Sequence, residues 1–117
     1  MNIAVFASGR GSNLRVILEK AEEGVLRNAR IILVVSNNSR CGAFDLAREY
    51  GIKTCHISSK THPDKAAHDA ALLTCLKEKA VELIVLAGYM KLLPENVVTA
   101  YRGRILNIHP ALLPKFG

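Results

Sequence analysis

The sequence predicts a doubly wound α/β fold with a mostly parallel, Rossmann-like sheet, and two observations support this prediction. Short apolar runs alternate with longer amphipathic stretches along the whole chain, which is typical of parallel strands joined by helical crossovers. Half of the 117 residues are apolar, which is too many for a disordered chain and enough for a single core. Because no repeat, low-complexity tract or linker interrupts the pattern, we expect one domain over residues 1–117.

The first half of the chain begins with two strands, each followed by a helix. Residues 3–7 form the first predicted strand, which leads through the glycine-containing segment 8–13 into a helix with apolar residues at helical spacing as far as Gly24. The second strand, residues 30–36, is a continuous run rich in β-branched residues. A polar loop and an amphipathic helix follow it, and this helix ends at Gly51, since glycine readily adopts the left-handed conformation of a C-cap.

The second half continues the alternation with three strands and two helices. Residues 53–57 are a short strand, and residues 67–79 carry the apolar pattern of the next helix. Residues 82–87 are the fourth strand. Pro94 suits the first turn of a short helix, because that position needs no N–H donor. Residues 104–108 are the fifth strand.

Doubly wound sheets bind ligands outside the carboxyl ends of their strands, where the strand order reverses. Three predicted strands end there in residues other than ordinary turn formers, namely in segments 8–13, 88–91 and 107–109. We therefore expect the functional site to be built from these three segments.

The charge balance favours an anionic ligand. Lysine and arginine outnumber the acidic residues by 16 to 10, which gives a net charge of +6 and suits a phosphorylated metabolite or a polyglutamylated cofactor. The basic residues are dispersed and aromatic residues are few, so a nucleic-acid surface is disfavoured. No apolar run reaches the length of a membrane span, and the N-terminus has no basic leader. These features predict a cytoplasmic protein that binds small molecules.

The cysteines and histidines give no sign of a disulfide framework or a metal site. The three cysteines are odd in number, far apart in sequence and outside any C-x-x-C pair, which fits free thiols in a reducing compartment. The four histidines have no metal-ligand spacing, so we expect no metal. The histidines are His56, His62, His68 and His109.

The glycine segment favours an anion at the start of the first helix, where free backbone N–H groups and the helix dipole attract negative charge. Gly11 lets the backbone approach an oxyanion closely, and the side chains of Ser12 and Asn13 add donors. A dinucleotide fingerprint would need a glycine where Leu14 stands, and no lysine follows in the register of an ATP-binding loop. A phosphate monoester therefore fits better. A tight turn in which Ser12 or Asn13 caps the helix is an equally open alternative.

Asn107 and His109 form a second candidate site. Residues two apart on a strand point to the same face, so these two side chains can reach one reaction centre, and Pro110 restricts the backbone of His109 to extended geometry. An amide that donates to an oxyanion beside an imidazole suits acyl transfer to an amine. No nucleophile adjoins them, which favours direct attack by the substrate amine. The alternative is a histidine at a strand end with Asn107 holding a turn.

Several motifs resemble those of the folate-dependent formyltransferases. NIHPALLP at residues 107–114 is similar to their catalytic signature, and IAVFASGRGSN at 3–13 and VLAGYMKLL at 85–93 match in the same order and spacing. The resemblance covers all 117 residues and implies the formyltransferase fold. It is strongest to the members that act on glycinamide ribonucleotide, because Pro110 follows the histidine and the loop reads Gly-Ser-Asn. Members that act on methionyl-tRNA and the formyltetrahydrofolate hydrolases are less similar.

The resemblance implies a role for each candidate residue. Gly11, Ser12 and Asn13 would hold the substrate phosphate. Asn107 would donate to the formyl oxygen, and His109 would act as proton donor or electrostatic partner. The residues that would contact the folate are Lys65, Met90, Lys91, Leu92, Leu93 and Asn107. Relatives often have an arginine in place of Lys65, so the charge persists here without the bidentate geometry.

The implied reaction is transfer of a formyl group from 10-formyltetrahydrofolate to the glycine amine of 5′-phosphoribosylglycinamide, a step of purine (IMP) biosynthesis. Family members continue beyond this point, and an aspartate there supports the charged form of the histidine. We therefore expect this chain to be the N-terminal part, truncated on its C-terminal side, and to catalyse poorly alone. Alternatives are a catalytically incompetent phosphate- or nucleotide-binding module of the same fold, or another folate-dependent formyltransferase or hydrolase.

Overall fold

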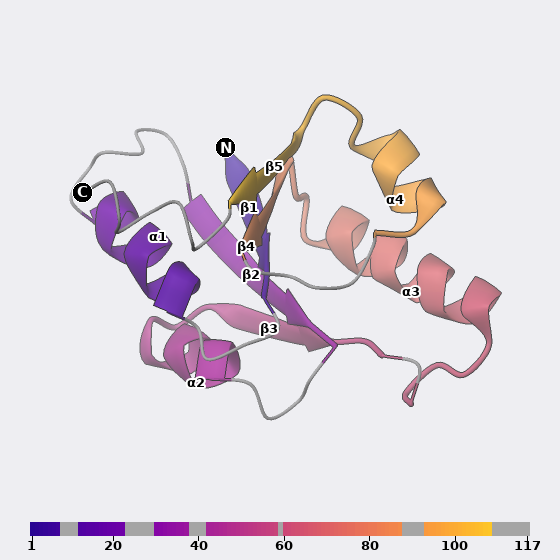
Figure 1. The fold of residues 1–117 in the computed structure, drawn as a ribbon, viewed down its shortest axis with the longest axis horizontal. Coiled ribbons are helices and arrows are strands. Elements are labelled where there is room, and N and C mark those ends of the chain that lie inside the picture. The colour runs from indigo at the N-terminus through magenta and orange to yellow at the C-terminus, as the bar shows by residue number, and fades with distance from the viewer. Residues whose placement is uncertain (8–11, 23–29, 38–41, 59, 88–92, 109–117) are drawn as a thin grey trace.

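A five-stranded parallel sheet forms the centre of the computed structural model, with helices on both of its faces (Figure 1). The structure describes residues 1–7, 12–22, 30–37, 42–58, 60–87 and 93–108. The strands lie in the order β3-β2-β1-β4-β5, and each neighbouring pair is parallel. They are β1 (Asn2–Phe6), β2 (Arg30–Ser36), β3 (Lys53–His56), β4 (Leu83–Ala87) and β5 (Ile105–Ile108). The predicted doubly wound α/β fold is confirmed.

Two helices cover each face of the sheet. α1 (Ser12–Glu22) and α2 (Gly42–Glu49) lie on one face, and α3 (Lys65–Glu78) and α4 (Glu95–Ala100) lie on the other (Figure 1). The central strand β1 contributes to both layers because its side chains alternate between the faces. Val5 packs with α1 and α2, whereas Phe6 packs with α3 and α4, and both side chains are fully buried. The strands are therefore continuous apolar runs, as expected for a parallel sheet covered on both sides.

The strand order reverses between β1 and β4. The chain proceeds from β1 outward through β2 to β3, and then crosses back to place β4 on the other side of β1 and β5 beyond it. This reversal is the point at which a doubly wound sheet opens a crevice between the loops that follow its strands. The candidate site segments 8–13 and 88–91 follow the two strands on either side of it.

The predicted boundaries agree with the structure to within one or two residues, and the second strand matches at both ends. One difference concerns Pro94, which occupies the N-cap of α4 with extended backbone (φ −61°, ψ 151°) instead of the first helical turn. Its φ suits either position, so the choice depends on ψ, which the proline ring does not fix.

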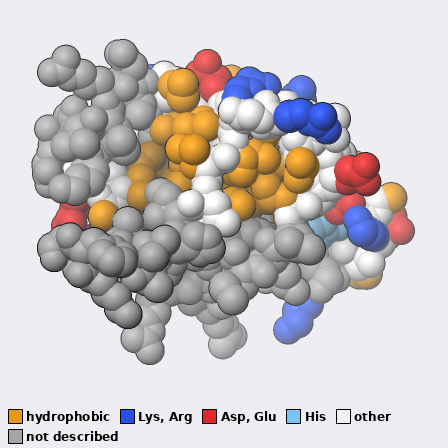
Figure 2. Space-filling model, turned by 45° about the horizontal axis from the view of Figure 1, so that its top comes forward, with side chains coloured by type: hydrophobic (Ala, Val, Ile, Leu, Met, Phe, Trp, Pro, Cys, Tyr) orange, Lys and Arg blue, Asp and Glu red, His pale blue; other side chains and the backbone are white. Residues whose placement is uncertain are grey.

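Apolar surface remains next to the edge strand. β5 and α4 lie at the top of Figure 1, and hydrophobic side chains occupy the middle of the face seen when this side is turned forward (Figure 2). Leu106 of β5 is 53% exposed and Val98 of α4 is 39% exposed. Ile105 packs with the α3 and α4 layer, so the alternation along β5 directs Leu106 toward the opposite face.

Candidate active site

The carboxyl ends of the central strands align at one edge of the sheet. Phe6 of β1 is in register with Leu86 of β4, and Leu86 is in turn in register with Asn107 of β5. Asn107 thus lies one strand away from the reversal point, in the ladder and not in a turn. The alternative role for the Asn107 side chain, holding a turn after the strand, stays a prediction.

The side chain of Asn107 is exposed at this edge. Residues two apart on a strand share a face, and Ile105 packs against the layer formed by α3 and α4. Asn107 accordingly belongs to the α3 and α4 face of the sheet. An exposed amide in this position can donate a hydrogen bond to a ligand that lies outside the strand ends.

The start of α1 provides backbone donors at the same edge. α1 begins at Ser12, so the backbone of Ser12 and Asn13 belongs to its first turn, whose N–H groups have no partner within the helix. The alternative in which Ser12 or Asn13 caps this helix stays a prediction. The first-turn N–H groups of α1 fit the oxygens of a phosphate monoester.

Five predicted site residues lie outside the described residues. They are Gly11, Met90, Lys91, Leu92 and His109. The structure therefore does not test the predicted pairing of His109 with Asn107 or the backbone contacts of the predicted folate pocket.

A pocket of about 430 Å³ lies between the start of α3 and the start of α4. It brings together Lys65 and Leu93, which are 28 positions apart and which the resemblance to the formyltransferases assigns to the folate contacts. Charged, imidazole and apolar side chains surround it. The lining residues are His62, Pro63, Lys65, His68, Asp69, Leu93, Pro94 and Glu95.

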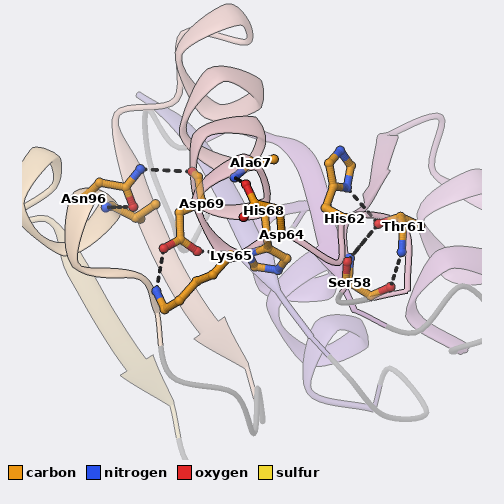
Figure 3. A network of polar contacts seen from close by, with 10 residues as sticks. Ser58, Thr61, His62, Asp64, Lys65, Ala67, His68, Asp69 and Asn96 are labelled. Atoms are coloured by element: carbon orange, nitrogen blue, oxygen red, sulfur yellow. Dashed lines mark hydrogen bonds and ion pairs between the residues drawn. The ribbon is translucent and has the colours of Figure 1, made fainter.

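Charged side chains on the first turns of α3 form a compact group in this pocket (Figure 3). Lys65 Nζ donates to Asp69 Oδ2 at 2.7 Å, and His68 Nδ1 lies 3.0 Å from Asp69 Oδ1. The Lys65 side chain remains 84% exposed, whereas that of Asp69 is 20% exposed. The hydrogen bond from Lys65, together with that from His68, lowers the pKa of Asp69 below its usual value. Lys65 is thus held by Asp69 while most of its surface stays accessible to an anion.

Three further contacts hold the walls of the pocket in place (Figure 3). Asn96 Nδ2 donates to the backbone oxygen of Asp69 at 3.0 Å, which ties α4 to α3. On the other side, Thr61 Oγ1 accepts from the Ser58 N–H at 2.9 Å and lies 2.9 Å from Nδ1 of His62. These bonds position His62 at the entrance to α3.

Sequence reasoning did not identify the other polar pocket residues. The sequence pattern that could have predicted them is the spacing of Lys65 and Asp69. These residues are four positions apart and so lie next to each other on a helix, and His68 is adjacent to Asp69. Asn37, which follows β2, was not predicted as a site residue either. Its Oδ1 is buried and has no hydrogen-bond partner among the described residues.

Within the described ranges, no three His, Cys, Asp or Glu side chains are grouped so as to hold a metal ion. In the same part of the chain, no helix is long and apolar enough to cross a bilayer.

Comparison with known proteins gives consistent matches over the whole chain. The family model for formyl transferases (Formyl_trans_N) matches residues 1–117. The chain is 42% identical to a chloroplastic phosphoribosylglycinamide formyltransferase of Arabidopsis thaliana over 98% of its own length and 39% of that protein. It is 39% identical to the phosphoribosylglycinamide formyltransferase of Bacillus subtilis, over 97% of this chain and 57% of the relative.

A solved structure gives the same result. The crystal structure of glycinamide ribonucleotide transformylase 1 from Symbiobacterium toebii superposes with a TM-score of 0.86 at 40% identity, covering 99% of this chain and 54% of that one. The chain thus spans between about two fifths and three fifths of the length of these relatives.

Proposed function

This chain belongs to the formyl transferase family, and on that premise we propose that residues 1–117 are the N-terminal domain of a phosphoribosylglycinamide formyltransferase. The enzyme transfers a formyl group from 10-formyltetrahydrofolate to the glycine amine of 5′-phosphoribosylglycinamide in purine biosynthesis. Two relatives with this name are 42% and 39% identical to the chain. The observation that carries the proposal is the exposed Asn107 at the carboxyl edge of the sheet, one strand from the point where the strand order reverses.

The phosphate of the ribonucleotide binds at the start of α1. Gly11, Ser12 and Asn13 supply backbone N–H groups, and the side chains of Ser12 and Asn13 supply further donors. The N–H groups of the first helical turn support this assignment, because they have no partner within the helix and can donate to phosphate oxygens.

The folate binds between the loop after β4 and the start of α3. Met90, Lys91, Leu92 and Leu93 form one wall, and Lys65 faces it with a positive charge. Support comes from the pocket that joins Leu93 to Lys65, which has apolar side chains for a ring system and a cation for a carboxylate. No metal takes part in this assignment.

Asn107 and His109 carry the chemistry. The Asn107 amide donates to the formyl oxygen, and its hydrogen bond strengthens as negative charge develops there during attack by the amine. His109 in its charged form stabilises the same oxygen and supplies a proton. The substrates are small molecules, and a cytoplasmic location for the reaction is part of this proposal.

A steady-state formyl-transfer assay of the full-length protein tests these roles. Asn107→Ala should lower kcat by about 10²–10³-fold and His109→Ala by about 10²–10⁴-fold, because each removes stabilisation that acts in the transition state. Asn107→Asp, which keeps the shape but cannot donate, should be at least as impaired as Asn107→Ala. His56→Ala is the matched control, since His56 lies on β3 at the far side of the sheet and should leave turnover unchanged.

The same assay separates the alternatives. Near-normal turnover in Asn107→Ala or His109→Ala contradicts the assigned roles. Formate release that does not need the ribonucleotide identifies a hydrolase. Binding of the ribonucleotide by calorimetry, without formyl transfer by the wild-type protein, identifies a module that binds phosphate without catalysis.

A further inference from the structure

Two cysteines that are 20 positions apart in sequence meet in the fold. Cys55 lies on β3 and Cys75 lies on α3, and their Sγ atoms are 3.0 Å apart and share a hydrogen bond. Both thiols are free and only partly buried, and both pack at the border of the core layer under α3. The spacing of the cysteines in the sequence does not indicate this contact.

The surroundings make the two thiols unequal. The shared hydrogen bond favours a thiolate at Cys75, and the nearby Lys79 ammonium adds to this effect against the opposing influences of partial burial and Glu78. These influences lower the pKa of Cys75, whereas the same hydrogen bond, together with partial burial, raises the pKa of Cys55. A thiolate is the nucleophilic form of cysteine, so the lowered pKa favours Cys75 as the thiol that attacks an oxidant. The 3.0 Å contact places Cys55 within reach of the oxidised Cys75 sulfur.

We propose that Cys55 and Cys75 form a reversible redox site, in which a peroxide converts the thiol pair into a disulfide that fastens α3 to β3. Closing the bond requires the sulfur atoms to approach by about 1 Å, from the observed contact to a disulfide length near 2.05 Å. Partial exposure of both residues gives an oxidant access. The inference does not depend on the proposed catalytic function.

The chemistry balances with a hydroperoxide as the oxidant. The Cys75 thiolate attacks a peroxide oxygen, the O–O bond breaks, and the departing hydroxide takes up a proton, which leaves a sulfenic acid on Cys75. The Cys55 sulfur then attacks the Cys75 sulfur, the S–O bond breaks and water leaves. Two thiols and one hydrogen peroxide thus give one disulfide and two waters, and an external dithiol reverses the change.

The crosslink would act on the wall of the pocket. The segment between the two cysteines contains His62, Pro63, Lys65, His68 and Asp69, which line it. In the reduced protein β3 holds this segment at one end and α3 holds it at the other. A disulfide closes it into a covalent loop, which limits how far the start of α3 can move from the sheet.

Peptide mapping after exposure of the full-length protein to hydrogen peroxide tests the proposal directly. Trypsin places each of the three cysteines of this sequence in its own peptide, namely residues 41–48, 54–60 and 66–77. We expect peptides 54–60 and 66–77 to appear as one linked species, about 2 Da lighter than their sum, and to separate after reduction. Cys41→Ser is the matched control and should form the same link.

Cys55→Ser removes the resolving thiol and should leave a sulfenic acid on Cys75, detectable with a dimedone-type probe. Cys75→Ser should slow the loss of the first thiol at pH 7 about tenfold, because Cys55 alone has an ordinary or raised pKa. The proposal is overturned if peroxide takes Cys75 to the sulfinic acid with no linked peptide, or if the link joins peptide 41–48 instead. Mapping of the wild-type protein decides this even where a variant does not fold.

Discussion

Asp69 shows at the scale of single residues how the pocket holds its charge. Its carboxylate accepts from Lys65 and contacts His68, and its backbone oxygen accepts from Asn96. Asp69, on the second turn of α3, therefore holds both the Lys65 ammonium, which faces the pocket, and the neighbouring helix α4.

Replacing Lys65 by methionine should raise the pKa of Asp69, because the hydrogen bond from Lys65 is the main cause of the lowered value. A carboxylate with a lowered pKa stabilises the folded state at neutral pH, and this contribution is lost as the pH falls from the usual carboxyl range through the lower folded value. In Lys65→Met the free energy of unfolding should therefore fall less steeply as the pH is lowered through the acidic range. Carbon-detected NMR titration of the Asp69 carboxyl gives the pKa, and Lys77→Met on the same helix is the control. An unchanged Asp69 titration in Lys65→Met contradicts the assignment.

For single residues, the sequence predicts the position of a candidate side chain on its strand better than it predicts which side chains from different elements contact each other. Asn107 could be placed at the strand end from periodicity alone, and the structure has it in β5. The contact between Cys55 and Cys75 could not be predicted, because it depends on how α3 is rotated over β3. The same rotation, together with the position of α4, decides that His68 and Asp69 face a pocket.

At the scale of elements, α3 begins with a side-chain cap immediately before Lys65. Asp64 has extended backbone (φ −78°, ψ 123°), and its carboxylate accepts from the Ala67 N–H at 3.0 Å. The cap satisfies one of the free donors of the first turn, which is the turn that carries Lys65 and leads to His68 and Asp69.

Asp64→Ala should destabilise the protein by about 1 kcal/mol, within a range of roughly 0.5–2 kcal/mol. Asp45→Ala on α2 is a matched control, because among the described residues Asp45 forms an exposed pair with Arg48, and such pairs contribute about 0–1 kcal/mol. Urea denaturation of both variants measures the difference. If Asp64→Ala costs no more than Asp45→Ala, the cap does not stabilise α3.

The elements themselves are largely predictable from the sequence. Apolar runs of strand length and helical periodicity identified five strands and four helices, because a sheet buried on both faces needs continuous apolar strands. The ends of the elements are less predictable, as Pro94 illustrates, since they depend on caps and on the path of the preceding loop. The strand order β3-β2-β1-β4-β5 was not predicted, because the strands carry no pairing signal in their sequences.

At the scale of the whole molecule, the sheet separates two apolar layers. One contains side chains of α1 and α2, such as Ile17, and the other contains side chains that face α3 and α4, such as Ile84 of β4. The two layers meet only through the strands, which contribute alternate residues to each.

Substitutions in the two layers should therefore act independently. Ile17→Val and Ile84→Val should each lower the free energy of unfolding by about 0.5–1.5 kcal/mol, and the double variant should lose the sum to within about 0.5 kcal/mol. Urea denaturation of the single and double variants measures this. A coupling above about 1 kcal/mol would mean that the sheet transmits changes from one layer to the other.

The central position of β1 has a consequence for synthesis of the protein on the ribosome. β1 is made first, yet Ile3 pairs with Leu83, 80 positions later, while its other neighbour β2 begins at Arg30. At about 5–20 residues per second, roughly 4–16 s pass between translation of these two partners. During that interval one edge of a highly apolar strand has no partner. Nascent chains halted before residue 83 should therefore bind chaperones that recognise apolar strands, and longer ones should release them.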